Sequence, residues 1–222
     1  MDIRPESPAN VFTDLGIQYL MRGKNDLALE NFKTALDADS QSSEAHHAIA
    51  ILFQRLKRDD LREDHLKQAV SLRPSNASAQ TDYGNFLCER ENYVEADAHY
   101  QKAIATPLYQ SPWRAMTSAG ICAQRAGRLD AAEKYLREAL KVRPNFGPAL
   151  LALAKISLES GSAFSGRAFI QRYLIGKRSS AEALRVGVEI EEALGDQAAA
   201  EAYRSRLRSE FPDSDEATSL DE

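Results

Sequence analysis

The chain has 222 residues, of which 43% are hydrophobic and 27% charged, and its formal net charge is −5. Nucleic acid is not expected as a partner, because phosphate binding needs a basic surface. A membrane-spanning helix is not expected either, because no apolar run reaches the roughly 18 residues that one requires.

A small residue recurs along the whole chain at nearly constant spacing. The steps are 34, 34, 36, 34 and 34 residues, and the positions are Gly16, Ala50, Gly84, Gly120, Ala154 and Val188. This is the period of the tetratricopeptide repeat, in which two helices form each unit. Small residues let the paired helices approach closely, while larger apolar residues fill the space around them. The sequence therefore predicts an all-α fold, a right-handed superhelix of about six helix-turn-helix repeats.

The repeats account for most of the chain. We expect an N-terminal linker over residues 1–8 and an acidic tail over residues 215–222. Between them we expect a single domain over residues 9–214. Its repeats are expected at 9–42, 43–76, 77–112, 113–146, 147–180 and 181–214.

The first repeat carries more apolar residues than its core needs. Residues 12–19 supply the motif, and we expect Phe12, Leu15, Gly16 and Tyr19 on the core face; Ile17, Leu20 and Met21 are apolar as well and are expected to face the concave groove. A helix that is apolar on both faces is normally covered by something. The cover is either a peptide or strand of a partner, or neighbouring repeats and residues 1–8. The predicted protein-binding positions are Ile17, Leu20, Met21, His47, Ile51 and Asn85.

Two further features lie in the third and fourth repeats. Cys88 and Cys122 are expected on first helices that stack side by side. They are either two small buried residues or a disulfide between repeats, which needs an oxidising compartment. The two extra residues of the third repeat fall in the segment 106–113, which carries two prolines and two aromatic residues.

No catalytic, cofactor-binding or metal-binding residue is predicted. Residues 161–166 have the glycine spacing of a phosphate-binding loop but lack its lysine and its serine or threonine. None of the four histidines or two cysteines has the spacing of a metal site. The clamp that some tetratricopeptide domains place on a terminal carboxylate is also missing, because Thr13 and Ile17 occupy its positions. We therefore expect a binding protein rather than an enzyme, with no cofactor.

Several stretches carry features that a generic repeat does not require. They are residues 83–88, 107–109, 119–122, 125–127, 172–174 and 207–214. In these stretches the chain resembles the PilF/PilW family, the tetratricopeptide pilotins that act as lipoproteins in type IV pilus biogenesis.

The resemblance implies an outer-membrane lipoprotein that faces the periplasm. It implies that secretin subunits of the type IV pilus are the protein partner, and that the protein promotes their localisation and assembly. Members of the family attach to the membrane through a lipidated N-terminal cysteine. This chain lacks that cysteine, so we expect the full-length protein to carry it before Met1. We expect a monomer.

Two other functions remain open at this point. One is a tetratricopeptide scaffold for another multiprotein complex. The other is an accessory subunit of an enzyme whose catalytic chain is separate.

Overall fold

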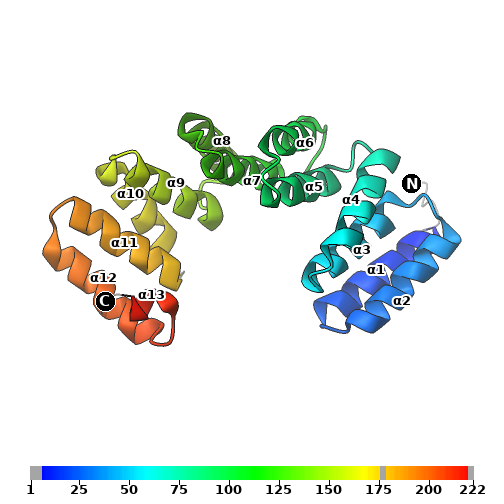
Figure 1. Cartoon of the computed structure of the whole chain (residues 1–222), viewed down its shortest axis with the longest axis horizontal. Helices are drawn as coiled ribbons and strands as arrows, with labels where there is room; N and C mark the ends of the chain where they lie inside the picture. The colour runs from blue at the N-terminus through cyan, green and yellow to red at the C-terminus, as the bar shows by residue number, and fades with distance from the viewer. Residues whose placement is uncertain (1–6, 176–178, 220–222) are drawn as a thin grey trace, which may run out of the picture. The chain divides into compact units, whose positions relative to one another are not determined.

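The computed structural model describes residues 7–175 and 179–219, and within them all regular structure is helical (Figure 1). The prediction of an all-α tetratricopeptide fold is confirmed. Each odd-numbered helix from α1 to α11 packs against the helix that follows it. None of the described helices has the length and apolar character needed to cross a membrane. The helices are α1 (Pro8–Met21), α2 (Asn25–Ala38), α3 (Ser43–Arg55), α4 (Asp59–Leu72), α5 (Ala77–Glu89), α6 (Tyr93–Ala105), α7 (Pro112–Arg125), α8 (Leu129–Val142), α9 (Gly147–Glu159), α10 (Ala163–Leu174), α11 (Ala181–Ala193), α12 (Gln197–Glu210) and α13 (Asp215–Thr218).

The repeated glycine is explained by the distance between paired helices. A Cβ atom added to Gly84 on α5 would lie 2.7 Å from the Tyr100 ring on α6. The same addition at Gly120 on α7 would lie 2.6 Å from Leu136 on α8. Real Cβ atoms do not approach other atoms so closely, so each pair can pack at this distance only because the first helix lacks a side chain there.

Each first helix ends in the same type of turn. After α1, the Gly23 amide donates to the Leu20 carbonyl at 3.0 Å, and the Lys24 amide donates to the Tyr19 carbonyl at 3.0 Å. This Schellman arrangement needs a left-handed backbone at the residue that Gly23 occupies with φ of 73°. The equivalent residues after α3 and α5 are Lys57 and Glu91, with φ of 55° and 60°. Two of the six turns therefore place a side chain where glycine is favoured.

The contacts divide the chain into two compact units, Met1–Gln110 and Ser111–Glu222. The first unit has a core between α1, α2 and α3 around Phe32, Ile49 and Leu52. The core of the second unit is larger and includes Leu153 and Ile170. The single domain over residues 9–214 and its repeat boundaries stay predictions.

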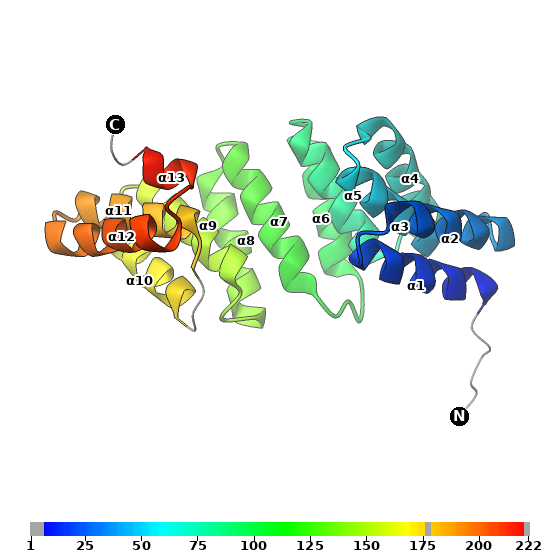
Figure 2. The same cartoon turned by 90° about the horizontal axis from the view of Figure 1, so that it is seen from below.

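The two expected terminal segments are partly described. Residues 1–6 and 220–222 lie outside the described residues, whereas Ser7 caps α1 and Pro8 begins it. In the segment expected to be an acidic tail, α13 packs against α11 and α12 (Figure 2). Its Ala217 is buried with Leu184 and Leu207.

Candidate protein-binding site

Three of the predicted binding residues expose large apolar side chains in the first unit. Ile17 and Met21 lie one turn apart on α1 and are 37% and 79% exposed. Ile51 is 38% exposed on α3, which packs against α1. We call these three residues the N-terminal apolar surface. Large exposed apolar side chains on helices that pack together are typical of interaction sites.

Leu20 does not belong to this surface, and its predicted position is wrong. It is only 7% exposed and lies in the core with Phe32 and Ile49. The reason is its spacing: Leu20 follows Gly16 by four residues, so both face the same side of the helix. Its carbonyl also accepts a hydrogen bond from the Arg55 guanidinium on α3, which holds this end of α1 in place.

Leu15 departs from its prediction in the opposite direction, because the sequence predicts a buried residue on the core face and the structure exposes it. Leu15 is exposed, as is Val11 one turn earlier on the same helix. In later repeats the equivalent residue is covered, for example Ile49 and Tyr83, which are both buried. Among the described helices α2 and α3 contact α1, and they leave Leu15 36% exposed.

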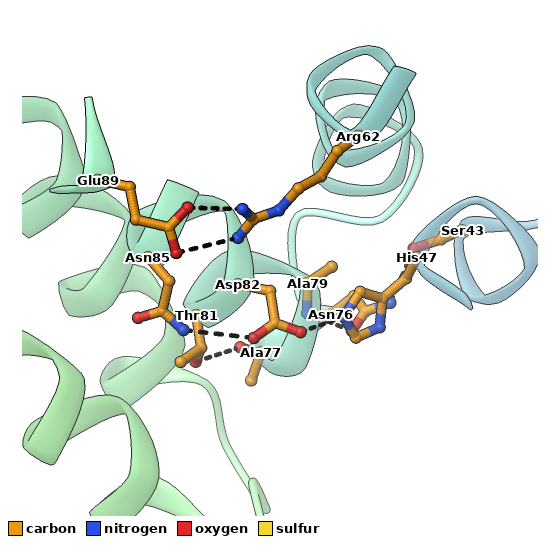
Figure 3. A network of polar contacts seen from close by, with 10 residues as sticks. All are labelled: Ser43, His47, Arg62, Asn76, Ala77, Ala79, Thr81, Asp82, Asn85 and Glu89. Atoms are coloured by element: carbon orange, nitrogen blue, oxygen red, sulfur yellow. Dashed lines mark hydrogen bonds and ion pairs between the residues drawn. The ribbon is translucent and has the colours of Figure 1, made fainter. Parts of the chain in front are cut away.

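The two polar residues of the predicted site belong to one hydrogen-bond network, shown in part in Figure 3. His47 Nε2 on α3 donates to Asp82 Oδ2 on α5 at 2.7 Å. Asn85 Nδ2 donates to Asp82 Oδ1 at 3.4 Å, and Tyr100 on α6 donates to Asn85 Oδ1 at 3.0 Å. Asp82 and Tyr100 were not among the predicted binding residues. Asp82 had a signal, because it precedes Asn85 by three residues and so shares its helix face.

A second polar contact joins the same repeats. Arg62 on α4 is buried, although a small residue is usual at its place in the repeat. Its guanidinium donates to both carboxylate oxygens of Glu89 on α5, at 2.6 and 3.4 Å (Figure 3). It also lies 5.1 Å from the centre of the Phe86 ring. The contact is both bidentate and stacked, so it fixes the orientation of α4 relative to α5.

His46 and His65 form a pair between α3 and α4. Their Nδ1 atoms lie 2.9 Å apart, and their ring centres lie 5.1 Å apart. Burial lowers the pKa of both imidazoles below the usual value. A short contact between two ring nitrogens needs one nitrogen without a proton as the acceptor. The His46–His65 contact therefore forms only when at least one of the two rings is neutral, and in that state it contributes to the packing of the second repeat.

Both cysteines lie on helices at the expected places, Cys88 on α5 and Cys122 on α7. Both are buried, and among the described residues no cysteine is a free thiol. Their pairing with each other stays a prediction.

Comparisons with known proteins agree with this fold. The tetratricopeptide repeat family matches residues 75–145 and 118–183. PilF of Pseudomonas aeruginosa, a type IV pilus assembly protein, is 25% identical over 205 residues, which cover 92% of this chain and 81% of PilF. The crystal structure of PilW, a widely conserved type IV pilus biogenesis factor, superposes with a TM-score of 0.89. It is 31% identical, and the match covers 96% of this chain and 97% of PilW. The chain belongs to the PilF/PilW family of type IV pilus biogenesis proteins.

The structure of Pseudomonas aeruginosa PilF has the same fold, with a TM-score of 0.86 at 24% identity and 96% of each chain covered. The PilF/PilW family consists of tetratricopeptide scaffolds rather than enzymes. The protein is thus a non-enzymatic protein of the type IV pilus system, and the residues to consider are those that contact partners.

Proposed function

We propose that this protein is a pilotin, which binds secretin subunits of the type IV pilus and promotes their assembly at the periplasmic face of the outer membrane. Membership of the PilF/PilW family supports a role in pilus biogenesis. The observation that carries the binding proposal is the N-terminal apolar surface. It is a place where a protein partner can remove large apolar side chains from water.

The chemistry of this surface indicates the kind of segment that it accepts. Complete burial of a fully exposed large apolar side chain contributes about 1.5–3 kcal/mol. Met21 is 79% exposed and gains most of this when a partner covers it, whereas Ile17 and Ile51 are already more than half covered and gain less. Met21 is flexible and polarisable, so it can adapt to different partner side chains. His47 lies one turn before Ile51 on the same face of α3, and its pairing with Asp82 of α5 supplies polar groups next to this apolar side chain. An apolar strand or peptide of the secretin, with its backbone polar groups near the His47–Asp82 pair, fits this combination.

The test is capture of secretin from envelope extracts by the purified protein. The variant Ile17→Glu/Met21→Glu places charges on the apolar surface, and we expect it to lose secretin capture with its helical circular dichroism unchanged. Val94→Glu is a matched control, because Val94 is 82% exposed on α6 and is not one of the predicted binding residues. Equal capture by the two variants would show that this surface is not the binding site.

The partner and the compartment are tested separately. If the unaltered protein recovers no secretin, the proposed partner is wrong whatever the variants do. Membrane fractionation should place the full-length protein with the outer membrane, and protease should reach it only after the outer membrane is opened. Loss of the gene should reduce secretin multimers and twitching motility, which the wild-type gene restores and the Ile17→Glu/Met21→Glu gene does not.

A further inference from the structure

The second unit contains a separate hollow that the proposed function does not use. It has a volume of about 930 Å³ and is lined by α7, α9, Tyr173 of α10 and the first turn of α11, together with the residues just before α9. Its apolar lining comes from Ile121 on α7, Phe146 before α9 and Leu151 on α9. A hollow of this size accommodates several side chains of a bound segment.

The charged groups of this hollow are unevenly compensated. Lys155 on α9 pairs with Glu182 on α11, and Glu159 accepts a hydrogen bond from Gln124 at 2.6 Å. Arg125 and Arg143 also line the hollow, and within the described part of the chain neither has a carboxylate partner. Three basic and two acidic side chains line the hollow, so it carries one net positive charge in a chain whose net charge is −5.

Arg143 is held by two aromatic rings. Its guanidinium lies 5.0 Å from the centre of the Trp113 ring and 5.7 Å from that of Phe146. Stacking on ring faces restrains a guanidinium while leaving the N–H groups at its edge available. These N–H groups match the two oxygens of a carboxylate. Arg143 is therefore oriented for an acidic ligand before the ligand binds.

We propose that this hollow, which we call the C-terminal groove, binds an internal extended segment of a protein partner that carries an aspartate or glutamate beside a large apolar residue. The acidic side chain contacts Arg143, with Arg125 adding to the positive field. The apolar side chain lies against Ile121 and Leu151. Charge complementarity selects this occupant, because an entirely apolar segment would leave both arginines without a carboxylate. The inference stands independently of secretin binding, since it concerns a different unit and a different chemistry.

The test uses a short fluorescein-labelled peptide in which glutamate alternates with leucine and phenylalanine. An amidated C terminus removes the terminal carboxylate, and the anionic fluorescein is identical in the acidic and the glutamine peptide, so the difference between the two peptides reports the glutamate side chains alone. Fluorescence anisotropy should show binding to the whole protein, and replacing each glutamate by glutamine should weaken it about tenfold, as expected for loss of charge-assisted hydrogen bonds. Equal affinity for the two peptides, or no binding of either, would overturn the proposal.

Variants of the protein locate the binding. Arg125→Gln/Arg143→Gln should weaken the acidic peptide about tenfold or more and leave the glutamine peptide unaffected. Arg143→Lys should retain only part of the affinity of the unaltered protein for the acidic peptide, because lysine keeps the charge but not the planar donors. Arg128→Gln is the control for net charge, since Arg128 is exposed at the start of α8 and does not line the hollow. An equal loss in Arg128→Gln would show general electrostatic attraction instead of a site.

Discussion

Replacement of Lys57 by glycine should stabilise the protein. Lys57 follows α3 with φ of 55°, in the same turn position that Gly23 occupies after α1. A left-handed backbone costs an L-residue roughly 1–2 kcal/mol. Glycine avoids this cost but loses about 0.4–1 kcal/mol through the greater freedom of the unfolded chain. The net gain expected for Lys57→Gly is therefore about 0.5–1 kcal/mol.

The measurement is urea denaturation followed by circular dichroism, with the midpoint compared between variants. Glu91→Gly tests the same reasoning at the turn after α5, where φ is 60°. Lys57→Ala separates backbone from side chain, because it removes the lysine and keeps a Cβ atom at positive φ. It should not raise the midpoint.

The reverse substitution completes the test. Gly23→Ala introduces a Cβ atom at φ of 73°, where the space around it is open, so any loss of stability comes from the backbone. The same two contributions with opposite signs give an expected loss of about 0.5–1 kcal/mol. If Lys57→Gly lowers the midpoint while Gly23→Ala leaves it unchanged, backbone strain does not explain the glycine pattern of these turns.

Three further predictions concern other contacts. The folded-state pKa of His46 and His65 is lowered, so below about pH 6.5 the unfolded chain binds more protons than the folded chain, and stability should fall as the pH drops further. Between pH 7.5 and 5.0, the unfolding midpoint of His46→Leu/His65→Phe should fall less than that of the unaltered protein. An identical fall would show that these two histidines do not cause the pH dependence. Arg62→Ala should lower the free energy of unfolding, measured by urea denaturation, by about 2 kcal/mol. The loss is smaller than for a fully buried pair, because the Glu89 carboxylate left behind can reach water. An unchanged midpoint would argue against the Arg62–Glu89 contact. A disulfide between Cys88 and Cys122 closes a loop of about 35 residues and should stabilise the folded protein by about 4 kcal/mol in the chain-entropy model. Intact-mass analysis with and without reductant detects the disulfide. Two alkylated thiols in the unreduced protein would exclude it.

The period of the small residues was enough to predict the helix pairs. The reason is visible at Gly84 and Gly120, where the pairing distance depends on one missing side chain. Faces within a helix were harder to assign. Leu20 was misplaced although its four-residue spacing from Gly16 puts both on one side of α1, and Leu15 was misplaced because its exposure depends on which neighbouring helices reach it.

The polar part of the site was only half predictable. His47 and Asn85 were predicted because a repeat places them on the groove side of a first helix, and their contact with a partner stays a prediction. The pairing of His47 with Asp82 joins residues 35 positions apart, and no local pattern encodes it. The same holds for the orientation of Arg143, which requires two rings from different segments.

The Arg62–Glu89 contact has a consequence for the entropy of binding. Bidentate geometry makes the α4–α5 joint directional, whereas helices held only by apolar contacts can slide against each other. The polar positions on α5 are thus preorganised, and a partner need not order them. Met21 on α1 is the opposite case, a side chain with three rotatable bonds that settles only when covered. The first unit therefore combines fixed polar positions on α5 with an adaptable apolar side chain on α1. As a proposed binding site, this combination fits partners that differ in side-chain shape but share a backbone register.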